Sequence, residues 1–286
     1  MFEKEEFWQN RFIAADHDYE ESDIVIVGLP FDGTASFRPG SRFGPNAIRE
    51  ASWGIETYSA RLKRDLRDLR IADLGDLEIP FGNAVQALRK IGPVIRRVIK
   101  DRKFPVVLGG EHLVSLPVVE ELHRSFSDLI VICLDAHTDL RDEYMGETHS
   151  HATVARRILD VVGEGHLFQV GVRSGTREEF EIQGVERVSL PGGETLSQFE
   201  GLLSNRPVYV ACDLDVFDPS ILPGTSAPEP GGLTFDQVTS FMTQLSRFQV
   251  VGFDVVELTP HYDQSRVSAI TASVLVREMI LQFCQS

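Results

Sequence analysis

Two acidic motifs, each directly after an apolar run, constrain this chain more than any other feature. The run LIVICL at 129–134 leads into DAHTD, and PVYVAC at 207–212 leads into DLD. Because side chains alternate along a strand, residues two apart at a strand end project on the same side. Each motif therefore predicts a strand that delivers several ligands to one site. These candidate ligands are Asp135, His137 and Asp139 in the first motif and Asp213 and Asp215 in the second.

Carboxylates gathered in one buried place require a counter-charge, because an unpaired buried carboxylate is strongly destabilising or takes up a proton. The GGEH segment at 109–112 ends another apolar run and adds His112 to the candidate ligands. A simple Gly-Gly turn before a helix would account for the same segment. Oxygen and imidazole ligands without a thiolate suit Mn²⁺ better than a structural zinc. The ligand set fits two ions if two aspartates bridge them, so we expect two Mn²⁺ per subunit.

Short apolar runs alternate with longer helical patterns through most of the chain. The expected strands lie at 24–30, 106–110, 129–136, 168–173, 207–213 and 250–257, and the expected helices at 46–62, 83–101, 116–126, 152–162 and 235–248. Apolar runs bounded by Gly, Pro or acids are typical of parallel strands covered on both faces. The alternation predicts an α/β fold with a doubly wound, mainly parallel sheet, in which ligands bind beyond the carboxyl ends of the strands.

Composition sets outer limits on the class of protein. With 286 residues and 42% hydrophobic content the chain can bury one large core, and we expect a single domain over 1–286. The net charge of -15 argues against a nucleic-acid partner and agrees with a cationic substrate, although acidic solubility explains the same value. The charged N-terminus, the lack of any long apolar run and the three cysteines, expected to be reduced, favour a cytoplasmic protein without a membrane partner.

In order along the chain, GGEH, DAHTD and CDLDVFDPSILPGTSAP resemble the three signatures of the ureohydrolase family of arginases and agmatinases, most closely the bacterial agmatinases. SFRPGSRFGPNAIR and DVVELTPHYDQS extend the similarity over almost the whole chain. The resemblance implies a three-layer α/β/α, arginase-like fold, a binuclear Mn²⁺ centre and a homotrimer or homohexamer. It also implies a ligand scheme in which Asp135 and Asp213 bridge the ions, His112 and Asp139 complete one shell, and His137 and Asp215 complete the other.

The chemistry of a guanidinium group suggests three catalytic residues. This group is resonance-stabilised and stays protonated, so its hydrolysis needs a hydroxide that two metal ions generate from water. Asp139 would then hold and relay the hydroxide proton. His151 matches the family's proton-shuttling histidine in the pattern His, small residue, Thr, with His149 as its competitor. Glu257 ends the VVGFDVVE run and would clamp the substrate guanidinium, whereas Asp254 within that run is expected to be structural.

The predicted substrate is a small cationic guanidino compound. The segment after DAHTD is short and lacks the Ser- and Asn-rich insertion with which arginase-like members hold an α-carboxylate and α-amino group. This favours agmatine, which would give putrescine and urea, over arginine; guanidinobutyrate and formimidoylglutamate stay open. The distal ammonium of agmatine would suit the acids Asp142, Glu143, Glu147 and Glu229, although solvated loop acids explain the same residues. A metal-stabilised scaffold and a dinuclear phosphatase are alternatives from other classes, and the second lacks a basic cluster for phosphate.

Overall fold

One parallel sheet of eight strands forms the centre of the computed structural model, which describes residues 10–80, 82–188 and 200–284. The strand order is β4-β1-β5-β10-β9-β6-β7-β8, and every neighbouring pair is parallel. The bounds are β1 Ile24–Leu29, β4 Ile71–Asp76, β5 Phe104–Gly109, β6 Ile130–Leu134, β7 Leu167–Val170, β8 Val185–Val188, β9 Pro207–Asp213 and β10 Gln249–Val256. Strands β2 (Tyr58–Ser59) and β3 (Arg64–Asp65) form a separate antiparallel hairpin.

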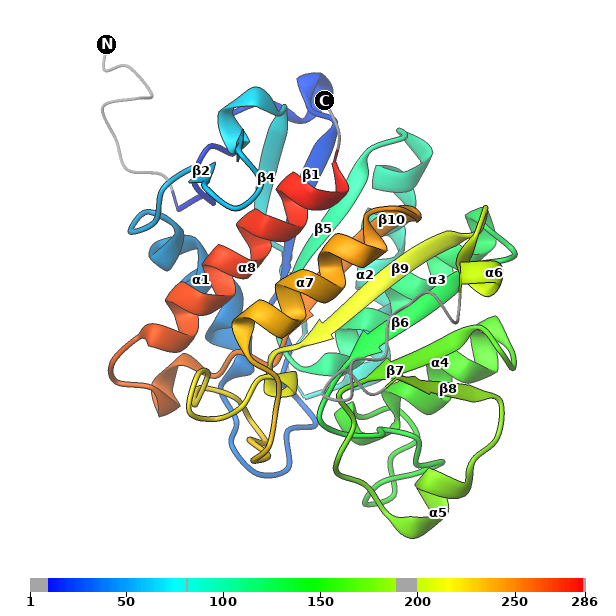
Figure 1. The fold of residues 1–286 in the computed structure, drawn as a ribbon. Helices are drawn as coiled ribbons and strands as arrows, with labels where there is room; N and C mark the ends of the chain where they lie inside the picture. The colour runs from blue at the N-terminus through cyan, green and yellow to red at the C-terminus, as the bar shows by residue number, and fades with distance from the viewer. Residues whose placement is uncertain (1–9, 81, 189–199, 285–286) are drawn as a thin grey trace.

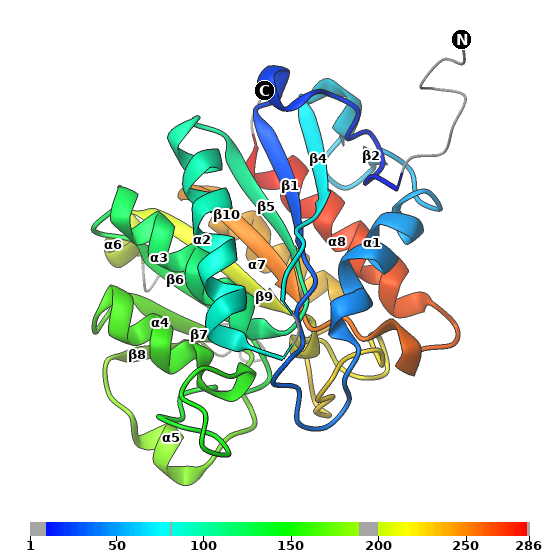
Figure 2. The ribbon, with the colours of Figure 1, turned by 180° about the vertical axis from the view of Figure 1, so that it is seen from behind.

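Helices cover both faces of the sheet. Helices α1 (Gly44–Ser52), α7 (Phe235–Leu245) and α8 (Val267–Phe283) lie on the face turned to the viewer in Figure 1. Helices α2 (Ala84–Lys100), α3 (Ser115–Ser125) and α4 (Val154–Val162) cover the other face, seen in Figure 2. Short helices α5 (Arg177–Glu181) and α6 (Glu200–Leu203) complete the set. Within the described ranges, no helix combines the length and the apolar character needed to cross a bilayer.

Side chains on the two faces of the sheet pack into two separate hydrophobic cores. In β1, Ile24 and Ile26 pack with α1, α7 and α8, while Val25 and Val27 pack with α2, α3 and α4. All six residues of this strand are buried, as expected for a parallel strand covered on both sides. The α/β/α layering predicted for the chain is therefore confirmed.

Several elements depart from the sequence prediction, which also did not include β8, the β2–β3 hairpin or the short helices α5 and α6. The helix expected over 46–62 ends at Ser52, because the backbone N–H of Gly54 bonds the carbonyl of Ala51, a tighter three-residue step that closes the last turn. Strand β4 was missed because acids and a glycine interrupt its sequence, IADLGD. Helix α8 was missed because it lies between α1 and α7, with ten of its residues buried, and so lacks a clear polar face.

The strand order brings four carboxyl ends together. After β5 the chain crosses to β6, and β10 and β9 later fill the two places between them. The central strands are therefore β5, β10, β9 and β6, and all four run in the same direction. The segments that follow them gather at the lower edge of the molecule in Figure 1, where the predicted ligands also lie.

Gly110, directly after β5, sits where no side chain fits. A Cβ atom there would lie 2.0 Å from the carbonyl oxygen and 2.7 Å from the amide nitrogen of Phe31. We expect Gly110→Ala to lower the free energy of unfolding by about 2 kcal/mol, because the backbone after β1 must move. Gly201→Ala in α6 is the control, since a Cβ there meets no atom within 4 Å. Urea unfolding of both variants tests this, and equal stabilities would contradict it.

Candidate functional site

Four neighbouring strand ends supply the predicted metal ligands and Glu257. His112 begins a short 3-10 turn, His112–Val114, two residues after Gly110, which directly follows β5. Asp135, His137 and Asp139 follow β6 at alternate positions, and Asp213 is the last residue of β9. Asp215 lies in the next 3-10 turn, Leu214–Val216, and Glu257 directly follows β10. The structure thus brings all of these predicted side chains to one edge of the sheet.

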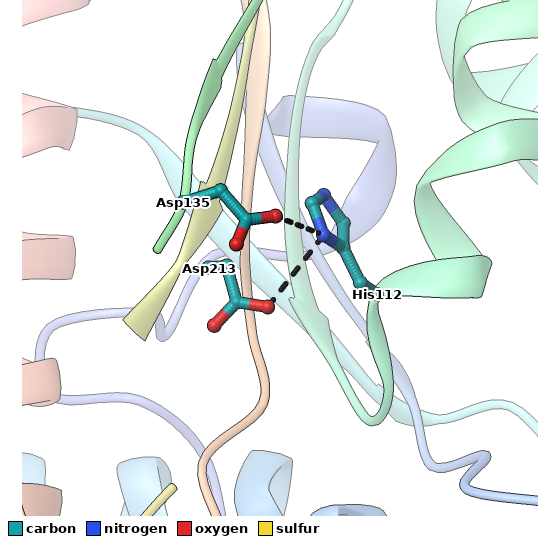
Figure 3. A group of neighbouring side chains, drawn as sticks. All are labelled: His112, Asp135 and Asp213. Atoms are coloured by element: carbon teal, nitrogen blue, oxygen red, sulfur yellow. Dashed lines mark ion pairs between the residues drawn. The ribbon is translucent and has the colours of Figure 1, made fainter. Parts of the chain in front are cut away.

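The side chains form two groups that share Asp135. In the first, His112 Nδ1 lies 3.0 Å from Asp135 Oδ2, 3.4 Å from Asp139 Oδ2 and 3.5 Å from Asp213 Oδ2. Figure 3 shows the carboxylates of Asp135 and Asp213 both turned toward the His112 ring. In the second, His137 Nδ1 lies 2.8 Å from Asp215 Oδ2 and 3.6 Å from Asp135 Oδ1. Each group has the donor types and the spacing to hold one cation.

Backbone amides orient three of the carboxylates. Asp135 Oδ1 accepts from the His137 N–H at 2.6 Å, and Asp213 Oδ1 accepts from the Asp215 N–H at 2.8 Å. Asp215 Oδ1 accepts from the Ala136 N–H at 2.9 Å. In each case the second oxygen, Oδ2, is left facing a histidine. The turns after β6 and β9 therefore fix each carboxylate with one oxygen and present the other to the site.

Burial makes the negative charge of this site costly. Asp135, Asp213, Asp215 and Glu257 are each less than 5% exposed. Burial and the nearby charges of Asp215 and Asp135 raise the pKa of Asp213 well above its usual range. Burial and the charge of Asp135 raise the pKa of Asp139 to about 7. The protein alone does not stabilise all of these carboxylates in their charged form, so the site favours a bound cation.

The two histidines respond in the opposite sense. Burial opposes the charged form of His137, but Asp135 and Asp215 beside it raise its pKa to about 12. Burial likewise opposes charge on His112, yet Asp135 and Asp139 raise its pKa well above its usual value. Neither ring nitrogen of the buried His112 has a hydrogen-bond partner of acceptable geometry. A buried imidazole aimed at carboxylates without a hydrogen bond fits a metal ligand, so the residues present suit a metal centre.

A pocket of about 270 Å³ opens beside the carboxylates. Its lining combines strand-end and loop residues, which include His137, Asp139, Asp213, Asp215, Ser226, Glu257, Arg141, Tyr144 and His151. Glu257 accepts from the His112 N–H at 2.7 Å and from the Ser226 hydroxyl. Asp139 and Glu257 both have positive φ, 49° and 66°, a conformation that costs non-glycine residues about 1–3 kcal/mol. The fold maintains this strain at two of the residues predicted to be catalytic.

His151 lies in this pocket, and His149 does not. His149 lines a different cavity, with Leu88 and Leu116. A capping box between Ser150 and Thr153 starts the 3-10 turn that carries His151, with the Ser150 N–H donating to Thr153 Oγ1 at 2.9 Å. Burial lowers the pKa of His151 to about 4, so its imidazole is neutral near pH 7. The position agrees with the choice of His151, while its catalytic role stays a prediction.

Sequence reasoning missed the residues that contact His151. Thr34, in the loop after β1, bonds both the backbone and the ring of this histidine, and Ser36 bonds the other ring nitrogen. Glu111, the acid of GGEH, in turn accepts from Thr34. The only signal in the sequence was that Glu111 is an acid next to the candidate ligand His112. No pattern in the sequence linked this acid to a loop about 80 residues earlier.

The four acids expected at the distal ammonium do not line the pocket. Asp142 is exposed and pairs with Arg156 and Arg157 at 3.3 and 3.4 Å. Glu147 lines a neighbouring cavity that shares Ser36 and Tyr144 with the pocket. Glu143 and Glu229 are likewise absent from the pocket wall. The structure therefore favours the alternative interpretation for Asp142, which is exposed and paired with arginines, and for Glu147, which lines the adjoining cavity.

Comparison with known proteins identifies the family. The profile of the arginase family matches residues 22–282. The agmatinase of Bacillus subtilis (strain 168) is 43% identical over 277 residues, 95% of this chain and 96% of the relative. The N(1)-aminopropylagmatine ureohydrolase of Thermococcus kodakarensis is 35% identical, over 84% and 83% of the two chains. The solved agmatine ureohydrolase of Thermoplasma volcanium superposes with a TM-score of 0.89 at 34% identity, over 97% and 95%. This chain therefore belongs to the arginase family.

Proposed function

We propose that this chain is an agmatinase, which hydrolyses agmatine with one water molecule to putrescine and urea. The observation that carries the proposal is a pocket beside two carboxylate–histidine groups that share Asp135, in a chain 43% identical to an agmatinase along 95% of its length. The pocket holds Glu257 and Asp139 beside these groups, so a guanidinium inside it faces several acceptors. A binding scaffold would not need a pocket of this kind beside its ions.

The proposed cofactor is a pair of Mn²⁺ ions. His112, Asp135, Asp139 and Asp213 would hold one ion and Asp135, His137, Asp213 and Asp215 the other, so that Asp135 and Asp213 would serve both. The two groups around His112 and His137 support this division, and Asp135 lies in both. When bound, the ions supply a water activated for attack on the guanidinium carbon.

Glu257 is suited to hold the substrate guanidinium. Its carboxylate is buried, lines the pocket and is fixed by the His112 amide and the Ser226 hydroxyl. Each oxygen has a further lone pair for an N–H of the substrate, so the group can make two parallel charge-assisted bonds. Holding the planar group in one orientation presents its carbon to the activated water.

Asp139 and His151 are suited to move the protons of the hydrolytic reaction. Asp139 lies on the pocket wall beside the carboxylate–histidine groups, where its carboxylate is suited to accept a proton from the attacking water and to pass it on. His151 is neutral near pH 7 and lies on the pocket wall near Tyr144, with ring centroids 5.8 Å apart. A neutral imidazole accepts a proton at its unprotonated nitrogen and can give it up again, which suits a shuttle between the departing amine and solvent.

Guanidinobutyrate is the second candidate substrate, and one observation favours it. Arg141 lines the pocket, stacks over Tyr144 at 4.7 Å and lies 3.4 Å from Glu179 through its Nε. The other guanidinium nitrogens of Arg141 would suit a distal carboxylate, whereas an ammonium would be repelled. Agmatine remains the first choice because Glu179 offsets the charge of Arg141.

Three further assignments complete the proposal. We infer a homotrimer or homohexamer, because the family relationship favours an oligomer. The same relationship supports a cytoplasmic enzyme of putrescine biosynthesis. The exposed apolar side chains Phe43, Trp53, Tyr262, Val267 and Ile270 provide surface for contacts between subunits.

Metal content tests the ligand assignment. We expect Asp135→Asn to lose both ions, because this carboxylate belongs to both groups, and His137→Asn to retain about one ion per subunit. The exposed Asp142→Asn is the control and should keep two. Elemental analysis after gel filtration, with anomalous diffraction at the manganese edge, measures the result. Two ions retained by Asp135→Asn would refute the assignment.

The pH dependence of metal binding follows from the pKa values. In the metal-free protein Asp139 titrates at about 7, and His137, with a pKa of about 12, is protonated. A cation must displace these protons, so the apparent Kd for Mn²⁺ should fall as pH rises, about tenfold per unit for each proton released. Calorimetry in buffers of different ionisation enthalpy counts the protons. A Kd independent of pH between about 6 and 8 would contradict the coupled release.

Substrate selection tests the activity. With Mn²⁺, we expect urea and putrescine in equal amounts from agmatine, and kcat/KM at least about tenfold above that for arginine, guanidinobutyrate or formimidoylglutamate. Glu257→Gln should lower kcat/KM for agmatine about 100-fold with metal content unchanged, because a charge-assisted bond pair is lost. Glu147→Gln, outside the pocket, is the matched control. Higher efficiency on guanidinobutyrate, lost in Arg141→Met, would select the second candidate instead.

A further inference from the structure

Glu111 is a fully buried acid that belongs to neither carboxylate–histidine group. It lies between Gly110 and His112, yet its side chain turns toward the loop after β1. Glu111 Oε2 accepts from the Thr34 N–H at 2.8 Å, and Glu111 Oε1 accepts from the Thr34 hydroxyl at 2.7 Å. A buried carboxylate with both oxygens on one residue holds that residue in a single position.

The Thr34 hydroxyl uses all of its hydrogen-bonding positions in contacts with Glu111 and His151. It donates to Glu111, accepts from the His151 backbone N–H at 3.0 Å and lies 3.2 Å from His151 Nδ1. A hydroxyl has one proton and two acceptor sites. In the ionised form of Glu111 the hydroxyl proton points to this carboxylate and one acceptor site holds the His151 backbone N–H, so the remaining site is left for a proton on Nδ1. Ser36 Oγ, 3.1 Å from His151 Nε2, can then donate to the unprotonated ring nitrogen.

We propose that Thr34 and Glu111 are positioning residues for His151, which fix its ring and keep the proton on Nδ1, so that the lone pair of Nε2 points to the Ser36 hydroxyl on the pocket wall. The inference rests on the proposed function, since it assumes that His151 moves a proton during hydrolysis. It extends that function to two residues that lie outside the metal groups. Orientation of a catalytic group in this way is worth up to about 100-fold in rate.

The loop that carries Thr34 is itself held in place. Asp32 accepts from the Gly40 N–H at 2.8 Å and from the Arg42 N–H at 3.4 Å, and its carboxylate also pairs with the Arg42 guanidinium. Near its start, the Glu111 N–H bonds the Phe31 carbonyl at 2.7 Å. Both sides of the loop are therefore tied down, and Thr34 can act as a fixed support for the ring.

Two substitutions at one position test the proposal. Thr34→Val keeps the shape but removes the hydroxyl, and we expect kcat to fall about 10- to 100-fold while KM changes less than about twofold. Thr34→Ser keeps the hydroxyl and should retain activity within about threefold. Crystal structures of both manganese-loaded variants should show the His151 ring rotated in Thr34→Val and unmoved in Thr34→Ser. Metal content should be unchanged in both, because Thr34 contacts neither carboxylate–histidine group.

A double-mutant cycle separates positioning from a merely structural role. In the background of His151→Asn, adding Thr34→Val should lower kcat by less than about twofold, because the group it positions is gone. Glu111→Gln, which keeps the shape of the acid, should reproduce the loss seen in Thr34→Val. Full activity in Thr34→Val, an equal loss in Thr34→Ser or an undiminished loss in the His151→Asn background would each overturn the proposal. If the parent protein hydrolyses no guanidino compound, the proposed function fails, and the ring position in the crystals still decides the inference.

Discussion

A surplus of buried negative charge at one edge of the sheet is the constraint on which the rest of this structure depends. Four aspartates and one glutamate meet there, opposed by the two histidines His112 and His137 and by Arg141 on the pocket wall. The cost is visible in the raised pKa values of Asp213, Asp139 and Glu257, the last of which burial raises to about 7. A fold retains such an arrangement when a cation offsets the repulsion between the carboxylates. The charges of the site and of its cofactor therefore balance each other.

The parallel sheet makes this concentration of charge possible. Its central strands β5, β10, β9 and β6 all end at the same edge, and the turns after β6 and β9 leave backbone N–H groups free to hold carboxylates. Each such bond uses one oxygen and aims the other at a histidine. The ligand positions are therefore set by rigid strand ends, which suits a site that must keep metal–ligand distances within a few tenths of an ångström.

Features with a local cause were predictable from sequence, and those that depend on distant contacts were not. Alternation of side chains along a strand is a local property. The convergence of Asp135, His137 and Asp139 could therefore be predicted from the five-residue segment DAHTD. Helix α8 escaped detection because burial between two other helices removed its polar face. The contact of Glu111 with Thr34 spans 77 positions and carries no periodic signal. The direction of Asp142 depends on arginines of α4, which the loop sequence does not reveal.

The division between strands and loops also separates two kinds of chemistry. The carboxylate–histidine groups belong to strand ends, whereas His151, Tyr144 and Ser226 reach the pocket from loops. Loops vary more readily than the sheet that supports them, so one metal centre can serve different substrates. The relatives agree with this view, since one is named for agmatine and another for N(1)-aminopropylagmatine. Substrate choice in this chain should therefore be sought in the loops after β1, β6 and β9, and the hydrolytic step in the strand ends.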